Sequence, residues 1–229
     1  MSLILQIETA TQTCSVALTE NGKLLHVIEK TDRNIHASSI TLFIEEVLKL
    51  GNKTAGDLDA VAVSMGPGSY TGLRIGVSTA KGLCYALDIP LIAVNTLEAM
   101  ASGFQNKCFS VQPQTLFCPM IDARRMEVYC SVFNADLEII TPTEAKIIDE
   151  DSFKELLSNY LVYFFGDGAT KCEETLGLNM NARIMDDYQN SAKDLTLLAF
   201  EKFEKADFVD VAYFEPFYLK DFVAGKKKD

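Results

Sequence analysis

A glycine-rich segment at Gly66–Gly72, with the sequence GPGSYTG, joins a predicted strand to a long predicted helix. Small residues at a helix start expose backbone N–H groups at the positive end of the helix dipole, and this arrangement binds anions such as phosphate. The segment matches neither common phosphate motif. Leu73 and Arg74 follow Gly72 where a Walker loop has Lys and Ser or Thr, and the last glycine comes one residue too late for G-x-G-x-x-G. Two interpretations stay open: an anion-binding loop, or a tight turn in which Thr71 caps the helix.

Histidines and cysteines, the usual metal ligands and nucleophiles, are few and scattered. His26 lies in a predicted strand and His36 at a predicted helix start, and neither has a second ligand at metal-binding spacing. The six cysteines contain no C-x-x-C pair, so we expect reduced thiols of a cytosolic protein and not a disulfide framework or a zinc site. We therefore predict no metal site and no Ser–His–Asp or Cys–His catalytic pair.

Two charged turns offer further chemistry. Asp122, Arg124 and Arg125 lie between two predicted strands, either as a phosphate-binding hairpin or as a turn whose charges face solvent and each other. Gly166-Asp167-Gly168 ends an apolar strand and is typical of a strand-to-helix turn.

The overall charge and the start of the chain exclude several classes of protein. The formal net charge is −11, and because nucleic-acid binding depends on phosphate neutralisation, the chain is predicted to bind nucleic acid poorly by itself. The one dense basic run, Lys226–Lys228, is expected to be a solvated tail. No apolar run has the length of a membrane span, and Met1–Glu8 lacks a basic leader pattern, so we expect no membrane contact and a cytoplasmic location.

The helix that follows the glycine-rich segment has two apolar faces. One face consists of Leu73, Val77, Ala80, Cys84 and Leu87, and the other consists mostly of small residues: Gly72, Gly76, Thr79, Leu83 and Ala86. A surface helix usually has a single apolar stripe, so this pattern predicts a helix covered on two sides. The second cover can come from the same chain or from another molecule.

The order of predicted elements repeats along the chain. Three strands, a helix, a strand, a helix, a strand and a helix occupy residues 1–104, and a similar order begins again in residues 105–229. The extended aromatic stretch Phe214–Phe222 is expected to pack back on the body. The pattern predicts an α/β protein with a duplicated lobe and mixed sheets.

Several of these segments together resemble the TsaB family, and the resemblance covers nearly the whole chain. The most specific segment is Gly66–Gly82, and Ile4–Leu18, Ile121–Tyr129 and Pro216–Lys220 support it. The family consists of non-catalytic partner subunits in bacterial tRNA threonylcarbamoyladenosine synthesis. The resemblance implies two ribonuclease-H-like lobes of the actin-like or Hsp70-like ATPase architecture. Residues 1–104 would form the dimerisation lobe and residues 105–229 a smaller lobe with an extended tail.

The resemblance also implies partners. The chain would pair with a catalytic homologue, TsaD, which transfers a threonylcarbamoyl group to tRNA, and a small ATPase, TsaE, would join the complex. The chain would meet tRNA only through this complex and would form a homodimer when alone. The implied pairing surface comprises Ile40, Phe43, Ile44, Val47, Gly72, Leu73, Gly76, Val77, Thr79, Ala80 and Leu83. A large charged residue in place of Gly76 or Ala80 should abolish pairing while the chain still folds.

Departures from the catalytic homologues imply a chain without a catalytic residue, metal or firmly bound cofactor. The homologue's metal-binding H-x-x-x-H is reduced to His36, because Ile40 fills the second position. The first-strand turn of actin-like ATPases, which handles phosphate and magnesium with Asp and Gly, reads Glu8-Thr9-Ala10 here. Weak nucleotide or anion binding stays open for Glu8, Thr9, Gly66, Gly68, Ser69 and Tyr70. The alternative function is an actin-like ATPase or phosphotransferase, or a metallo-glycopeptidase-type enzyme.

Overall fold

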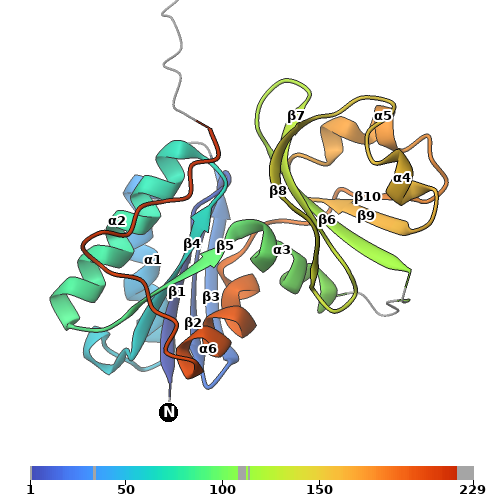
Figure 1. Ribbon diagram of the computed structural model, residues 1–229. Helices are drawn as coiled ribbons and strands as arrows, with labels where there is room; N and C mark the ends of the chain where they lie inside the picture. The colour runs from blue at the N-terminus through green and yellow to red at the C-terminus, as the bar shows by residue number, and fades with distance from the viewer. Residues whose placement is uncertain (1, 33–34, 108–111, 113, 221–229) are drawn as a thin grey trace, which may run out of the picture.

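The computed structural model describes residues 2–32, 35–107, 112 and 114–220. Antiparallel and parallel strands form two five-stranded sheets (Figure 1). The first sheet contains β1 (Leu3–Glu8), β2 (Thr13–Glu20), β3 (Lys23–Thr31), β4 (Ala60–Gly66) and β5 (Leu91–Asn95) in the order β3-β2-β1-β4-β5. The strands β1 to β3 form an antiparallel meander, whereas β4 and β5 run parallel to β1. Asn21 and Gly22, with φ of 49° and 73°, form the two-residue turn that this dipeptide favours between β2 and β3.

The second sheet repeats the first. It contains β6 (Thr115–Asp122), β7 (Glu127–Phe133), β8 (Ile139–Ile147), β9 (Leu161–Phe165) and β10 (Ala182–Met185) in the order β10-β9-β6-β7-β8. The strands β6 to β8 are antiparallel, and β9 and β10 run parallel to β6. The predicted duplication of a mixed α/β lobe is confirmed. The helices of this lobe are short: α4 (Lys154–Leu157), η2 (Thr170–Cys172) and α5 (Glu173–Leu176).

Helices cover both faces of the first sheet. Leu3, Leu5 and Ile7 of β1 belong to a core shared with α1 (His36–Leu50) and α2 (Tyr70–Leu87). Ile4 points to the opposite face, which η3 (Ala192–Leu195) and α6 (Thr196–Glu204) cover. Because successive side chains of a strand alternate between faces, a β1 that is buried along its whole length needs helices on both sides.

The helix α3 (Thr96–Gln105) lies between the two sheets (Figure 1). Asn95 begins it, and the Asn95 Oδ1 accepts hydrogen bonds from the N–H groups of Leu97 and Glu98. Phe104 stacks on Phe165 of the second sheet with ring centroids 4.1 Å apart, while Ala99 packs in the core of the first lobe. The lobes are therefore joined by a packed apolar layer and not by linkers alone.

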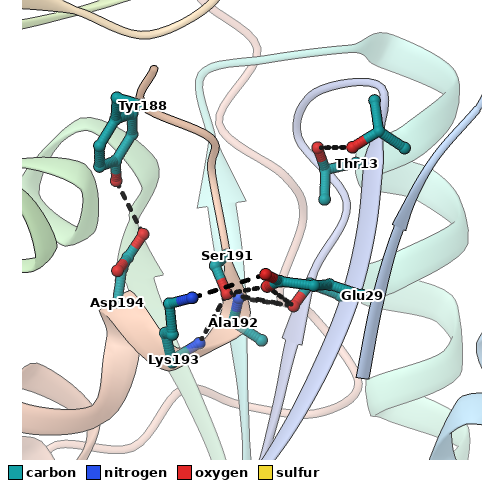
Figure 2. A network of polar contacts seen from close by, with 9 residues as sticks. Thr13, Glu29, Tyr188, Ser191, Ala192, Lys193 and Asp194 are labelled. Carbon is teal, nitrogen blue, oxygen red and sulfur yellow. Dashed lines mark hydrogen bonds and ion pairs between the residues drawn. The ribbon is translucent and has the colours of Figure 1, made fainter. Parts of the chain in front are cut away.

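The chain returns to the first lobe after β10, which corrects the predicted second lobe of residues 105–229. Figure 2 shows the crossing segment: Ser191 Oγ donates to a Glu29 carboxylate oxygen, and Tyr188 OH donates to Asp194 over 2.7 Å. Ala192 N also donates to Ser15 Oγ over 2.9 Å. The apolar residues of η3 and α6 then cover the inner face of the first sheet, because α1 and α2 occupy only its outer face.

None of the helices in the described part of the chain is both long enough and apolar enough to cross a lipid bilayer.

Candidate functional site

A cleft of about 810 Å³ lies between the lobes. Its first-lobe wall is formed by the β1–β2 turn and the first turns of α1 and α2, and its second-lobe wall by the β6–β7 turn and Asp167. The C-terminal residues Phe217–Lys220 also line it. Three of the residues predicted for an anion or nucleotide site line the cleft, namely Gly68, Ser69 and Tyr70, whereas Glu8, Thr9 and Gly66 do not.

The glycine-rich segment uses its backbone N–H groups inside the chain. Ser69 N donates to Ala10 O over 2.7 Å, and Gly66 N donates to Thr96 Oγ1 over 3.1 Å. Ser69 is the N-cap of α2, since its Oγ accepts from Gly72 N, so the prediction of Thr71 as the cap was wrong. These three N–H groups already have hydrogen-bond partners inside the chain, which favours the tight turn over the anion-binding loop.

The glycines of this segment allow α2 to lie directly on the β1–β2 turn. A Cβ on Gly68 would lie 2.5 Å from Ala10 O, and a Cβ on Gly72 would lie 2.1 Å from Thr9 O. A Cβ on Gly76 would lie 2.2 Å from Thr9 Oγ1. Only glycine permits so close an approach of the α2 backbone to the backbone of Thr9 and Ala10 and to the side chain of Thr9. The helix of the same lobe therefore covers Thr9 and Ala10 of the turn that the resemblance associates with phosphate, while Thr11 and Gln12 line the cleft.

Glu8 ends β1 and is fully buried. Its Oε1 accepts a hydrogen bond from Ala10 N over 2.6 Å, and burial raises the pKa of its carboxyl to about 7. Because the side chain has no exposed oxygen and α2 lies on the residues that follow it, Glu8 offers no ligand to a magnesium ion in the cleft. The residues of this turn therefore do not fit a phosphate–magnesium site.

His36 begins α1 at the edge of the cleft and is largely buried. Burial lowers its pKa, while hydrogen bonds with the backbone of Thr11 and Thr13 oppose that shift. Within the described ranges, no three His, Cys, Asp or Glu side chains lie together as ligands of a metal ion.

The C-terminal segment crosses the cleft from one lobe to the other. Phe217 N donates to Met65 O over 2.7 Å in the first lobe. Tyr218 lies against Tyr70 with ring centroids 4.9 Å apart, and its hydroxyl accepts from Arg74 Nε over 3.2 Å. Lys220 then forms an ion pair with Glu127 of β7. The sequence predicted that this aromatic tail packs on the body, but it gave no sign that the tail ties the lobes together.

Most of the eleven predicted pairing residues lie inside the chain. Eight of them are buried against the first sheet: Ile40, Ile44, Val47, Gly72, Leu73, Gly76, Val77 and Ala80. Phe43, Thr79 and Leu83 are half-buried. The prediction that the eight offer a docking surface was wrong, because the small residues of α2 serve its approach to the β1–β2 turn and the sheet. A charged residue at Gly76 would disrupt the fold itself.

The outer face of α1 and α2 consists of other residues. Leu42 and Leu50 of α1 are 58% and 50% exposed, and Tyr85 of α2 is 86% exposed. Gly82 lies on the same side of α2, and a Cβ there would meet nothing within 4 Å. Part of α2 is covered by the chain itself, since Lys81 Nζ donates to Phe214 O over 2.9 Å. We call Leu42, Leu50, Gly82 and Tyr85 the outer helix face.

Comparison with known proteins places this geometry in a family. The model of the tRNA N6-adenosine threonylcarbamoyltransferase family, TsaD, matches residues 29–227. The chain is 32% identical over 232 residues to the Escherichia coli tRNA threonylcarbamoyladenosine biosynthesis protein TsaB, covering 98% of this chain and 97% of that protein.

Solved structures show the same fold. YeaZ from Pseudomonas aeruginosa superposes with a TM-score of 0.77 at 24% identity, covering 96% of this chain and 100% of that one. An activator of 2-hydroxyisocaproyl-CoA dehydratase from Clostridium difficile, solved with bound ADPNP, gives a TM-score of 0.53 at 9% identity, covering 90% and 97%. The fold is thus that of the actin-like ATPases, with two ribonuclease-H-like lobes. On the sequence match over nearly its whole length, the chain belongs to the TsaB family.

Proposed function

We propose that this chain is a non-catalytic partner subunit in tRNA threonylcarbamoyladenosine biosynthesis, and that it pairs with a TsaD-like transferase through the outer helix face. Membership of the TsaB family supports the role in this biosynthesis. The TsaD family model matches most of the chain, so this chain and the transferase share a fold. A shared fold supports pairing of the two through equivalent helices. The β1–β2 turn does not fit a phosphate–magnesium site, and this supports a subunit without nucleotide chemistry.

The main support for this pairing surface is the open space around Gly82 in α2. A glycine inside a helix costs about 1 kcal/mol relative to alanine. Contacts with Thr9 explain Gly72 and Gly76, whereas Gly82 has open space around it in this chain. Close approach of a second helix accounts for a glycine at this position. The neighbouring Tyr85 is an exposed amphipathic ring of the kind that anchors protein interfaces.

The test is a Gly82→Arg variant in co-purification with the transferase of the same cell. The open space around Gly82 should allow the variant to fold, while the arginine should weaken pairing at least 10-fold. Leu197→Arg is the matched control, because Leu197 is a 45% exposed residue of α6 outside the outer helix face. Loss of pairing in the control only, or in neither variant, would refute the proposed surface.

Two further assemblies follow from the same surface. In the absence of the transferase, a homodimer should form through the outer helix face, and Gly82→Arg should make the chain monomeric in equilibrium sedimentation at micromolar concentration. A TsaE-like ATPase should join only the paired complex. A homodimer that survives Gly82→Arg would place its interface elsewhere.

A further inference from the structure

The β6–β7 turn holds two arginines in a conformation that arginine rarely adopts. Arg124 and Arg125 have φ of 72° and 52°, in the left-handed region that Asn and Gly prefer. The turn is closed by hydrogen bonds from Ala123 N to Glu127 O over 3.1 Å and from Arg124 N to Asp122 Oδ1 over 2.9 Å. The fold therefore keeps two arginines where Asn-Gly would be more stable, and a stability role does not explain them.

The carboxylates of the hairpin are paired with lysines and not with these arginines. Lys171 forms an ion pair with Asp122 and donates to Glu127 O over 2.7 Å. Lys220 of the C-terminal segment forms an ion pair with Glu127. Throughout the residues that the structure describes, neither Arg124 nor Arg125 forms an ion pair. The interpretation of this turn as charges that face solvent and each other is therefore correct for the exposure of both guanidinium groups and wrong for their pairing.

The charges of these two arginines are not neutralised inside the chain. Lys171 pairs with Asp122 and Lys220 pairs with Glu127, so the nearest carboxylates of the hairpin already have cationic partners. Arg124 and Arg125 are both exposed, and Arg124 lines the cleft, which also contains the carboxylates of Asp32 and Asp167. Two exposed guanidinium groups can attract an anion at short range, where the repulsion from more distant carboxylates is screened by salt.

We propose that Arg124 and Arg125 contact phosphodiester groups of tRNA when the chain is part of the modifying assembly. The inference rests on the proposed function and adds to it, because it gives this subunit a direct contact with RNA. Guanidinium groups bind phosphate oxygens through two parallel hydrogen bonds, and such contacts position a nucleic acid without reading its sequence. Because the side chains form no ion pair in the chain, no internal ion pair has to break before RNA binds.

The test separates a structural role of the arginines from an RNA contact. In the double variant Arg124→Asn/Arg125→Gly, the turn receives the dipeptide that suits its backbone, so the melting temperature should rise while RNA binding weakens. The assembly of chain and transferase is titrated into unmodified tRNA, and fluorescence anisotropy is followed at several salt concentrations. The dissociation constant should rise about 10-fold, and the slope of its logarithm against log salt should fall by about 1 to 2. Arg124→Lys/Arg125→Lys should keep most of the salt dependence.

The control removes equal charge elsewhere. Lys154→Ala/Lys205→Ala deletes two exposed cations, in α4 and just after α6, and should leave tRNA binding within 2-fold of the parent. Equal loss of RNA binding in both double variants, or no loss in the Asn-Gly variant, would overturn the inference. Pairing with the transferase is measured separately by gel filtration. Unimpaired tRNA binding in a complex that still forms refutes only the arginine contact, whereas a complex that never forms refutes the proposed function. Weakened pairing with unchanged RNA affinity would assign the arginines to an acidic protein surface instead.

Discussion

The β1–β2 turn and the β6–β7 turn occupy the same position in their two lobes, yet they have opposite surroundings. Each follows the central strand of its sheet and faces the cleft. In the first lobe, the 18-residue helix α2 lies on the turn and buries Thr9 and Ala10. In the second lobe, the corresponding position after β9 holds only η2 and the four-residue α5, and the turn is left exposed.

The residues that end the two central strands show the same contrast. Glu8 ends β1 in complete burial, and Asp122 ends β6 at the surface with Lys171 beside it. The glycines that end the neighbouring strands are conformationally alike, because Gly66 and Gly166 have φ of 112° and 101°. The duplicated fold thus keeps its backbone, while the length of one helix decides whether a turn belongs to the core or to the surface.

The largest effect should come from breaking the contact that covers the first turn. Gly72→Ala places a Cβ 2.1 Å from Thr9 O, a backbone atom that cannot move aside, so we expect the free energy of unfolding to fall by about 3 kcal/mol. Gly82→Ala is the control in the same helix. It should raise the free energy of unfolding by about 1 kcal/mol, because its Cβ meets nothing. Urea denaturation measures both, and equal effects at the two positions would contradict the contact.

The second prediction concerns pH and the buried end of β1. Burial raises the pKa of Glu8 to about 7 and that of Asp194 to about 6, so the folded chain binds these protons more tightly than the unfolded chain. The protonated carboxyls of Glu8 and Asp194 therefore contribute their full stability below their ordinary pKa. The free energy of unfolding then falls as pH rises towards 7, by up to about 1.4 kcal/mol per pH unit for each group. Glu8→Gln should remove the contribution of Glu8 to this pH dependence, and the variant should be more stable than the parent at pH 8. Denaturation at pH 5 and pH 8 checks this, and a parent whose stability rises across that range would exclude it.

The smallest effect should come from loosening the C-terminal segment, which contacts α2 in the first lobe and Glu127 in the second. Tyr218→Ala removes the ring contact with Tyr70 and the hydrogen bond from Arg74, so unfolding should become easier by about 1 kcal/mol. Hydrogen exchange should accelerate in the first turn of α2. Tyr213→Ala is the control, since Tyr213 is 85% exposed, and it should change neither quantity. Identical exchange in both variants would argue against the tie between the lobes.

Local chemistry made much of this fold predictable. The predicted order of elements depends on neighbouring residues, and the structure confirms it. The Asn21-Gly22 turn and the Asn95 cap are local features of the same kind. The cover of α2 depends on tertiary packing, which a helical projection cannot show. Gly72, Gly76 and Ala80 have the composition of a helix–helix interface, but they pack on the sheet and its first turn.

Other features could not be predicted from the sequence, because long-range packing overrides the local preference of the residues. The return of α6 to the first lobe follows from a sheet face that needed a cover far along the chain. The left-handed arginines contradict the preference of their own residue type. Exposure of Gly82, the residue that carries the proposed surface, could be recognised only once the contacts of Gly72 and Gly76 were known.

The most direct measurement is tRNA modification by the transferase of the same cell, with the parent chain, with Gly82→Arg, with Leu197→Arg, or with no added chain. We expect threonylcarbamoyladenosine formation with the parent and with Leu197→Arg, and a loss of at least 10-fold both without the chain and with Gly82→Arg. Full modification in the absence of the chain would contradict the proposed function. Full modification with a folded Gly82→Arg variant, when the reaction does need the chain, would contradict pairing through the outer helix face.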